Sequence, residues 1–379
     1  MFSGYIKADT INNKNAVDRI DVLYTPNPVW AAQDNWKIDP ISGNDDNSGE
    51  NMSPLQTWRE FQRRMKLVKG HSAAITIITI VSDLPDNDAM IIDWGTLTGF
   101  EAVYIHGSPT QIRTGVFTST PIARNPSMNQ PNEITDSSVN SWAGELGWNT
   151  GYQIIPTSGP AQNFPAWIVK DLGNHQARTS PFYDAVNFVD TTPALNDTYK
   201  IIKQTFVRNW CFMPLNGFWN INNLDLGDLS STKTGFGYPD WAVAMQFTDC
   251  SVHGIAPAHT TVFFYNCCFK EPLNAYGATF EVYAGACGNI MTDPTGELED
   301  GCDFMADNGF ITQGVRHMVI NFGYARLRDT GAFDSADYGW GVNSASNVRI
   351  QGLYGSGNAD WGLYVGPSGT AFGDRKSVV

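Results

Sequence analysis

Residues 36–65 read WKIDPISGNDDNSGENMSPLQTWREFQRRM, which combines a short strand, a polar turn cluster and an amphipathic helix. Ser53 is a suitable N-cap, Pro54 would occupy the first helical position, where no backbone N–H is needed, and Gln56 completes an S-x-x-Q capping box. An apolar stripe follows at steps of three and four residues, formed by Leu55, Trp58, Phe61, Met65 and Val68. The stretch therefore predicts a helix that starts at Pro54 and packs its apolar side, with Trp58, onto another element.

Two apolar segments follow this helix. Residues 74–81 are a nearly unbroken run rich in β-branched side chains, and residues 102–105 form a shorter one. Both are predicted to be strands. A fully apolar strand implies burial on both faces, and a helix that leads directly into such strands would cover the open end of a stack of sheets.

The order of motifs in the first stretch resembles the opening segment of right-handed parallel β-helix proteins of the pectate-lyase-like class. The matching motifs are Ile38-Asp39-Pro40, Gly43-Asn44-Asp45, Gly49, Ser53-Pro54-Leu55 and Thr57, followed by the helix. The resemblance is close over residues 36–65 and loose beyond them. It implies an all-β solenoid whose N-terminal end is capped by an α-helix. Such segments occur in polysaccharide-active enzymes and in bacteriophage tailspikes, so the resemblance specifies the fold better than the activity.

The composition is that of a folded, turn-rich protein. Of the 379 residues, 42% are hydrophobic and only 16% are charged, with 36 glycines and 12 tryptophans, which excludes wholesale disorder and favours an all-β fold. The net charge of −14 argues against binding to nucleic acid or to an anionic membrane, because either would need a basic face. Neutral glycans and other proteins remain as partners.

The sequence predicts neither a membrane span nor a bound cofactor. Residues 1–9 lack the features of a secretory signal, and no apolar stretch of about eighteen residues exists, so we expect a soluble protein made in the host cytosol. The cysteines at positions 211, 250, 267, 268, 287 and 302 form no C-x-x-C pair, so we expect buried thiols and no zinc.

A faint internal repeat occupies the second half of the chain. The pattern Phe247-x-x-Cys250-x-Val252 is matched by Phe264-x-x-Cys267-x-Phe269, and residues 221–226, 319–324 and 350–353 have related forms. Ala-Asp-aromatic-Gly occurs at 336–339 and again at 359–362. Unequal spacing suits solenoid coils whose loops vary in length, with the two cysteines as one step of an internal ladder. A β-sandwich or a propeller is the alternative.

These observations divide the chain into four parts. Residues 1–35 are predicted to be an N-terminal arm for attachment to a virion, and residues 36–109 the capping helix with the first coils. Residues 110–205 hold many prolines and scattered large aromatics, which indicates an insertion with strands of its own or one that packs on a neighbouring subunit. Residues 206–379 would form the main β-helix coils.

An acidic patch supplies the candidate catalytic residues. Glu297, Glu299, Asp300 and Asp303 could provide the two carboxyl groups, roughly 5–10 Å apart, that glycoside hydrolysis needs. A solvated acidic turn or a structural calcium site explains the same residues, and turns and capping explain the acidic residues at 39–50. The resemblance also implies a lyase with a basic proton abstractor, for which Arg316 is nearest, but the repeated acidic motifs of such lyases are absent from the sequence.

Large aromatic residues are the other functional candidates. Trp340, Tyr354, Trp361 and Tyr364 could stack on sugar rings, or could be buried in the core or between protomers of a homotrimer. Together with the resemblance, the sequence favours a structural protein of a bacteriophage virion, of tailspike, fibre or decoration type. It would contact other virion proteins and host-surface polysaccharide. A polysaccharide depolymerase on the same scaffold is the alternative.

Overall fold

The computed structural model is strand-dominated, which confirms the predicted all-β class. It describes residues 35–65, 75–92, 100–122, 132–142, 152–180, 182–184, 189–212, 217–227, 243–252, 261–269, 273–276, 279–283, 286–288, 296–299, 303–307, 310–314, 318–321, 324–335, 340–343, 347–356, 363–366 and 370–373. The predicted attachment arm therefore lies outside the described residues, except for residue 35.

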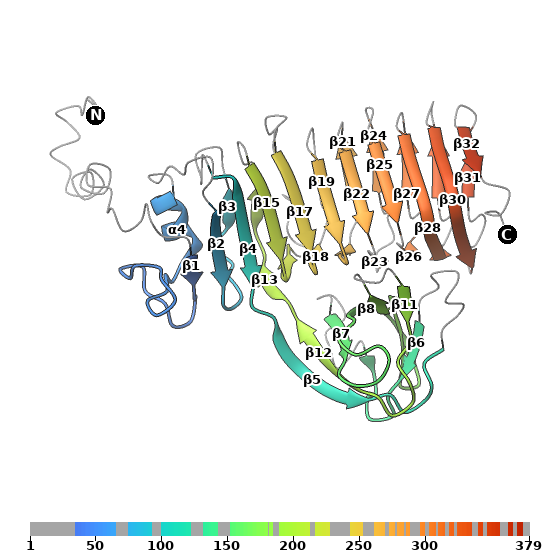
Figure 1. Cartoon of the computed structure of the whole chain (residues 1–379), viewed down its shortest axis with the longest axis horizontal. Helices are drawn as coiled ribbons and strands as arrows, with labels where there is room; N and C mark the ends of the chain where they lie inside the picture. The colour runs from blue at the N-terminus through green and yellow to red at the C-terminus, as the bar shows by residue number, and fades with distance from the viewer. Residues whose placement is uncertain are drawn as a thin grey trace.

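The largest sheet has 17 strands, and all of its described pairings are parallel. Two rows of strands make up this sheet. The front row consists of β1 (Asn35–Ile38), β2 (Ile75–Ile80), β4 (Ala102–Gly107), β15 (Gly217–Asn222), β17 (Val243–Thr248), β19 (Thr261–Tyr265), β22 (Thr279–Tyr283), β25 (Asp303–Asp307), β28 (Tyr324–Ser335), β30 (Asn347–Ser356) and β32 (Thr370–Gly373). The side row consists of β13 (Thr205–Val207), β16 (Leu224–Leu226), β18 (Ser251–Val252), β20 (Cys268–Phe269), β23 (Ala286–Gly288) and β26 (Phe310–Gly314). Figure 1 shows the front row advancing along the long axis.

Two smaller parallel sheets accompany these rows. One pairs β3 (Met90–Ile92) with β14 (Trp210–Phe212). The other, which we call the third sheet, contains β21 (Leu273–Tyr276), β24 (Gly296–Glu299), β27 (Met318–Asn321), β29 (Trp340–Asn343) and β31 (Leu363–Val365). Each strand pairs with the strand that lies one circuit later in the chain.

The chain turns from the front row to the side row at a recurring corner. Asn223, Asp249 and Asn266 occupy it in successive circuits, with φ angles of 55°, 53° and 48°. Asn and Asp tolerate this left-handed conformation better than other residues with a side chain. Further along, β28 pairs with both β25 and β26, so one long strand spans the front and side rows.

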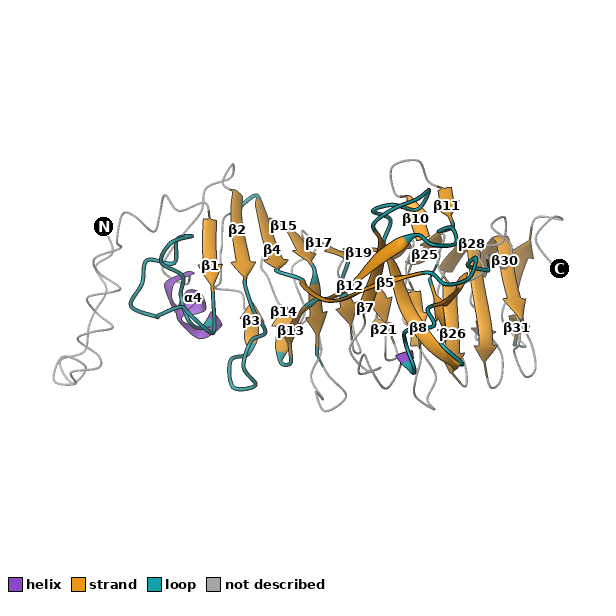
Figure 2. Ribbon diagram, turned by 90° about the horizontal axis from the view of Figure 1, so that it is seen from below, coloured by secondary structure: helices purple, strands orange, loops and turns teal. Residues whose placement is uncertain are grey.

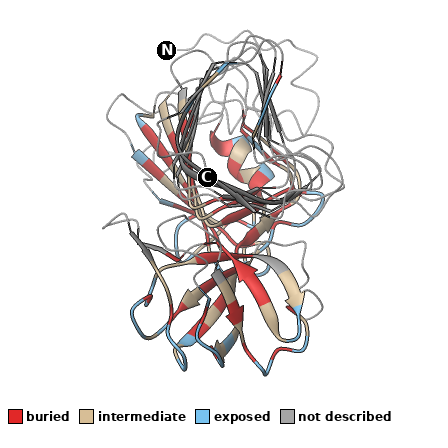
Figure 3. Cartoon of the chain, turned by 90° about the vertical axis from the view of Figure 1, so that its right-hand side faces the viewer, coloured by how far each residue is buried: buried red, intermediate tan, exposed pale blue. Residues whose placement is uncertain are grey.

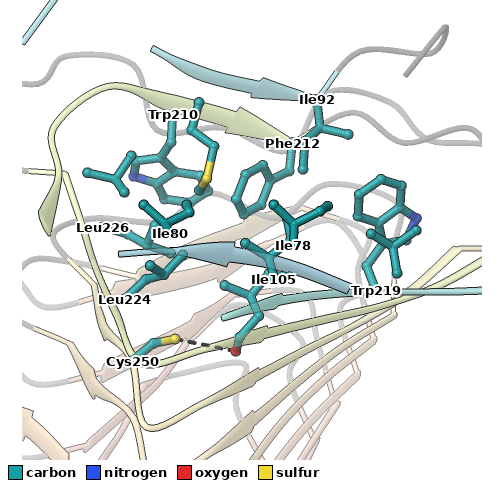
Figure 4. Close-up of a cluster of buried hydrophobic side chains, with 14 of the residues drawn as sticks. Ile78, Ile80, Ile92, Ile105, Trp210, Phe212, Trp219, Leu224, Leu226 and Cys250 are labelled. Atoms are coloured by element: carbon teal, nitrogen blue, oxygen red, sulfur yellow. Dashed lines mark hydrogen bonds between the residues drawn. The ribbon is translucent and has the colours of Figure 1, made fainter. Parts of the chain in front are cut away.

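Alternate residues of the front row fill the interior. Ile221, Phe247 and Phe264 are fully buried register partners, and the rings of Phe247 and Phe264 stack with centroids 5.0 Å apart. This confirms the repeat predicted around Phe247 and Phe264. The match predicted at Val319 is wrong, because that residue lies on β27 of the third sheet. Figure 4 shows the N-terminal part of this core, with Cys250 donating to the carbonyl of Ile221.

The strand β2 corrects a second expectation. Its residues alternate between buried and partly exposed, with Ile78 fully buried and Ile75 47% exposed. The run is therefore not buried on both faces. One side faces the core and the other belongs to the outer surface of the front row.

The helix α4 (Trp58–Met65) lies against the N-terminal end of the stack, next to β1 (Figure 2). Trp58, Phe61 and Met65 are buried in the same core as Trp36, and the rings of Trp36 and Phe61 meet edge to face at 5.6 Å. The apolar stripe of the helix thus covers the first circuit of strands.

The predicted start of this helix is wrong. Leu55 pairs with β1, where its N–H donates to Lys37 O at 2.9 Å, so the segment with Ser53 and Pro54 is extended rather than helical. The helix begins at Trp58, and Thr57 is the N-cap. The Thr57 hydroxyl accepts the N–H of Glu60 at 3.1 Å. The predicted box residue Gln56 instead precedes the cap, outside the helix.

Two acidic side chains from other segments complete the helix start. Asp45 accepts the N–H groups of Gln56 and Thr57 at 2.9 and 2.8 Å. Asp88 accepts those of Trp58 and Arg59 at 2.6 and 3.1 Å. Burial raises the pKa of Asp88, and these backbone donors act in the opposite direction. The start of α4 is thus fixed by long-range contacts.

Between β4 and β13 the chain leaves the parallel stack and forms an antiparallel unit, which we call the insertion. Its main sheet has the order β5 (Thr110–Val116), β12 (Thr198–Lys203), β7 (Tyr152–Pro156), β8 (Ala166–Gly173), β9 (Gln176–Thr179) and β6 (Asn132–Thr135). The hairpin of β10 (Phe182–Asp184) and β11 (Val189–Thr191) adds two more strands. The segment after β5 also bonds to β6, since Thr118 N–H donates to Thr135 O at 2.9 Å, which closes the sheet on itself.

The insertion has its own core, separate from that of the stack, as Figure 3 shows along the long axis. Phe117, Trp142 and Tyr199 are buried, and the Tyr199 ring contacts the rings of both Phe117 and Trp142. The Tyr199 hydroxyl donates to Asp136 at 2.5 Å, and burial raises the pKa of Tyr199.

The insertion lies against the side row. Asp225, Ser251 and Cys268 are register partners on the side row, at positions that alternate with the core residues. They therefore belong to its outer side, yet all three are buried. The strand β8 packs against β23, and the indole N–H of Trp167 donates to Asn266 O at 2.8 Å. At Asp225, Ser251 and Cys268 the outer surface of the side row is therefore buried beside the insertion, whereas most of the outer residues of β4, β15, β17 and β19 whose side chains are described stay partly exposed.

Candidate functional site

The outer surface of the front row forms two parallel lines of side chains. Side chains alternate along each strand, and the parallel register places every second residue next to its equivalent in the following circuit. The first outer line contains Tyr104, Asn220, Gln246 and Phe263, and the second contains His106, Asn222, Thr248 and Tyr265. Of these residues, Asn220 is 8% exposed, and the others are half-buried. Rings and amides thus share one surface.

Contacts among these side chains hold them in place. The Asn222 amide donates to the side-chain oxygen of Asn220 and lies 3.2 Å from His106 Nδ1. The rings of Tyr104 and His106 are parallel, with centroids 6.2 Å apart, and Phe218 meets the Tyr104 ring edge to face at 6.5 Å. The N-terminal half of this surface is therefore ordered before any ligand binds.

The imidazole of His106 is neutral at neutral pH. Burial lowers its pKa, because the charged form would lose solvation. A neutral ring can accept the Asn222 amide proton at Nδ1 and still offer Nε2 as a donor. The N-terminal half of the surface therefore presents hydrogen-bonding groups and rings without a charge from His106.

The same register extends both lines toward the C-terminus. The first line continues with Glu281, Met305, Arg326, Arg349 and Phe372, and the second with Tyr283, Asp307, Arg328 and Gln351. The side chain of Arg349 is exposed, which agrees with an outer position. At this end of the front row, Arg349 is thus the residue of the two lines whose side chain the structure describes.

The predicted carboxylates fall on two different sheets. Glu297 and Glu299 lie on β24 of the third sheet, whereas Asp303 is the first residue of β25 in the front row. Asp300 lies outside the described residues, as does Arg316. Asp303 thus belongs to a different sheet from the two glutamates and lies on the strand that carries Asp307.

The predicted aromatic residues that the structure describes lie on two different sheets. Trp340 and Tyr364 lie on β29 and β31 of the third sheet, where Tyr364 is 39% exposed. Tyr354 lies on β30, opposite Gly331. Trp361 is outside the described residues.

A partly buried carboxyl group joins the corner of the stack to the insertion. Asp249 accepts the amide N–H groups of Gln153, at 3.0 Å, and of Asn266, at 2.6 Å. Burial raises its pKa, and the two hydrogen bonds partly oppose the shift. The group links the insertion to the stack and does not lie on either outer line.

Two acidic residues of the first turn cluster, Asp39 and Asp45, accept hydrogen bonds from backbone N–H groups. Asp39 accepts the N–H groups of Ile41 and Ser42, both at 3.1 Å, and Asp45 accepts those at the start of α4. The hydrogen bonds of Asp39, with the Ser42 hydroxyl first, lower its pKa despite partial burial. Among the residues that the structure describes, no group of three or more His, Cys, Asp or Glu side chains is placed to hold a metal ion.

The sequence repeat also marks positions on the outer lines, which sequence analysis missed. The predicted repeat aligned Ile221, Phe247 and Phe264 as core positions. The residues one step further along, Asn222, Thr248 and Tyr265, then belong to the opposite side of the sheet. Every second residue of each strand, counted from Asn222, Thr248 and Tyr265, therefore lies on the outer surface.

The described residues define an all-β protein of stacked parallel strands with an antiparallel insertion and a half-buried line of rings and amides. No protein-family model matches the chain, and no curated protein sequence matches it significantly. In the part of the chain that the structure describes, no helix is long and apolar enough to cross a membrane.

Three solved structures illustrate what the chain is similar to. A GH136 lacto-N-biosidase from Eubacterium ramulus is 9% identical, with 96% of this chain and 72% of that one covered and a TM-score of 0.31. A tailspike of Acinetobacter baumannii bacteriophage AP22, in complex with A. baumannii capsular saccharide, is 10% identical over 74% of this chain and 53% of that one, with a TM-score of 0.26. A tailspike from Pseudomonas phage LKA1 is 11% identical over 82% and 68%, with a TM-score of 0.18. Similarity at this level carries no conclusion about fold or function.

Proposed function

We propose that this chain is a carbohydrate-binding structural protein of a bacteriophage virion, of tailspike, fibre or decoration type. In this proposal the stacked parallel strands are the coils of a right-handed parallel β-helix, and the outer lines of the front row contact host-surface polysaccharide. The observation that carries the proposal is the alignment of half-buried rings and amides, from Tyr104 to Tyr265, on the surface left free by the insertion.

The spacing of this surface suits a polymer of sugars. Neighbouring strands lie about 4.8 Å apart, so a ring or an amide recurs at intervals comparable to the size of one sugar ring. Flat faces such as those of Tyr104 and Phe263 can stack on the C–H face of a sugar, while the half-buried amide of Gln246 can bond its hydroxyl groups. A ligand with repeating units could therefore lie along the stack.

The virion part of the proposal has separate support. Residues 36–65 resemble the opening segment of parallel β-helix proteins, and the net charge of −14 disfavours nucleic-acid binding. We also propose the four-part division given above, with residues 1–35 as the arm that contacts other virion proteins and with a homotrimer as the assembly. A stack of parallel strands resists unfolding because each strand is bonded on both sides.

The binding proposal is tested on the full chain with isolated capsular polysaccharides and lipopolysaccharide glycans, by glycan array followed by calorimetry. Phe263→Ala should weaken binding about fivefold, because loss of one stacked ring removes roughly 1 kcal/mol. Tyr364→Ala is the matched control, because Tyr364 is an exposed aromatic residue on the third sheet. Absence of binding to every glycan, or equal loss in both variants, would contradict the proposal.

A depolymerase is the second candidate, and the register favours it at one point. Glu281 and Asp307 lie on neighbouring strands, two residues apart in register, which by strand geometry separates their Cα atoms by about 8 Å. Glycosidases use two carboxyl groups roughly 5–10 Å apart, so two acidic residues at neighbouring register positions are the pair to test.

Release of oligosaccharides from a bound polysaccharide would separate the depolymerase from a purely adhesive protein. Glu281→Gln and Asp307→Asn should each abolish this release and leave binding intact. Glu299→Gln tests the predicted acidic patch in the same assay, and a loss of release confined to this variant would assign the chemistry to the third sheet.

A further inference from the structure

We propose that His106 determines the specificity of the N-terminal half of the front row, where its Nε2–H donates to an oxygen of an uncharged sugar. This inference rests on the proposed glycan binding and adds the class of sugar and the group that recognises it. It comes from the hydrogen-bonded side chains of Asn220, Asn222 and His106, which we call the amide–imidazole triplet. The triplet decides which nitrogen of the imidazole carries the proton.

The contact with Asn222 selects one tautomer of His106. The side-chain nitrogen of Asn222 donates to the side-chain oxygen of Asn220 and lies 3.2 Å from His106 Nδ1. An amide nitrogen can only donate, so Nδ1 is the acceptor and a neutral imidazole holds its proton at Nε2. The reversed amide would place the Asn222 oxygen against the Asn220 oxygen, with no proton between them. The triplet therefore presents Nε2 as a donor.

Two polar atoms of the triplet remain for a ligand. Within the part of the chain that the structure describes, His106 Nε2 bonds to no protein group. Asn222 uses both of its N–H groups inside the triplet, so its oxygen is available as an acceptor. The two residues are half-buried register partners on strands about 4.8 Å apart. A sugar hydroxyl, which both donates and accepts, suits this pair of groups.

The neighbours of His106 leave it uncharged. Its register partners are Thr79 on β2 and Asn222 on β15, and neither titrates. Tyr104, on the same strand, holds its ring parallel to the imidazole, and Lys37 lies one strand beyond Thr79. Burial lowers the pKa of His106, and no described carboxylate lies at an adjacent register position to raise it.

The absence of charge continues along the surface. From β4 to β19 the outer lines consist of aromatic, amide and hydroxyl residues beside His106, although the chain has 38 acidic and 24 basic residues. A carboxylate bound here would lose solvation without a cation on these lines to pair with. The groups of an uncharged sugar lose less, because half-buried Gln246 and Thr248 can bond them. The surface therefore favours sugars without a charge.

The first test compares acidic and uncharged ligands on the full chain by calorimetry at pH 7.5. The probes are oligogalacturonate and oligosialic acid, each paired with its carboxyl-reduced form. Any polysaccharide of the glycan array that binds is paired with its carboxyl-reduced form or, if it is neutral, with its 6-carboxyl form. Wherever binding is detected, the uncharged form should bind at least tenfold more tightly. Equal or tighter binding of the acidic forms would overturn the inference.

The second test concerns the donor. His106→Phe keeps a ring but removes Nε2–H, and it should weaken binding of the uncharged form about fivefold. His106→Gln keeps a side-chain donor and should retain more of the affinity. The matched control is His175→Phe, a half-buried histidine of the insertion, which should bind as the parent does. Circular dichroism shows whether each variant is folded, and His106→Gln serves as the test if His106→Phe is not.

Two readouts separate this role from a merely structural one. Nitrogen-15 NMR should find the proton of His106 on Nε2 in the parent, and Asn222→Asp should move it to Nδ1 and weaken binding, because a carboxylate accepts that proton. Binding by the parent should also fall in acid, where a proton on Nδ1 opposes the Asn222 amide, and His106→Gln should show no such fall. A parent imidazole that is protonated on Nδ1 at pH 7.5 would overturn the inference.

The outcomes also distinguish this inference from glycan binding itself. Binding that Phe263→Ala weakens and that His106→Phe leaves unchanged would overturn the role of His106 and keep glycan binding. Absence of binding to all probes and to every polysaccharide of the glycan array would overturn both.

Discussion

Two consecutive phenylalanines on β19 allow the inner and outer sides of the front row to be tested separately. Phe264 is fully buried and stacks on Phe247, with ring centroids 5.0 Å apart, whereas Phe263 is half-buried on the first outer line. Phe264→Ala removes a buried ring and leaves a cavity, which costs about 3–5 kcal/mol of unfolding free energy. Phe263→Ala loses only partly buried surface and should cost about 1 kcal/mol.

The two variants should also differ in function. Phe263→Ala should weaken glycan binding about fivefold with little loss of stability. Phe264→Leu is the control for volume, and it should cost less than about 1.5 kcal/mol because the site stays filled.

Urea unfolding followed by tryptophan fluorescence gives the stability difference, and hydrogen exchange locates it. Each circuit contacts mainly its neighbours, so the protection of β17, β19 and β22 should fall first in Phe264→Ala. A loss of less than 1 kcal/mol for Phe264→Ala, together with a larger loss for Phe263→Ala, would refute the reasoning. It would mean that the strand is shifted by one residue, which exchanges its two sides.

Three further predictions concern stability. Asp249→Asn should raise the melting temperature at pH 7, because the folded state raises the pKa of this partly buried carboxyl and its ionised form therefore opposes folding. The Asn oxygen can still accept both hydrogen bonds, and the difference from the parent should vanish as the pH falls below the pKa of an unfolded Asp, at about 3.9; an equal gain at pH 3 would contradict this. Thr57→Ala should cost about 1 kcal/mol through loss of the N-cap to Glu60, measured by urea unfolding, with no effect expected from Ser53→Ala. Gly107→Ala should destabilise by about 1–3 kcal/mol, because a Cβ there would clash with the backbone oxygen of Asn223, and a neutral result in the same assay would exclude that clash.

Local signals in the sequence predicted the parts of the fold that depend on neighbouring residues. The apolar stripe of Trp58, Phe61 and Met65 identified the helix and its packing, and the repeat around Phe247 and Phe264 identified register partners. The start of the helix could not be predicted in this way. Ser53 and Pro54 satisfy the local rules for a helix start, but the pairing of the following residue with β1 holds them in an extended conformation.

The candidate site was harder to predict, because its residues are separated by long stretches of sequence. Tyr104 and Asn220 are register partners on either side of the insertion, and only the parallel pairing of β4 with β15 brings them together. Sequence analysis instead favoured residues close in the chain, such as Glu297 and Glu299, which lie on a different sheet from the outer lines. Local density of one residue type was therefore a poor guide to a surface built from one or two residues of each circuit.

The insertion leaves and rejoins the parallel stack at almost the same point. The chain departs after Ser108 and returns at Thr205, whose hydroxyl donates to the Ser108 carbonyl at 3.2 Å. A short linker between these two positions could replace the whole antiparallel unit without changing the path of β4 or β13. The stack can thus accept a different module at this point, and exchange of the insertion would change the surface beside the side row while leaving the path of the parallel strands unchanged.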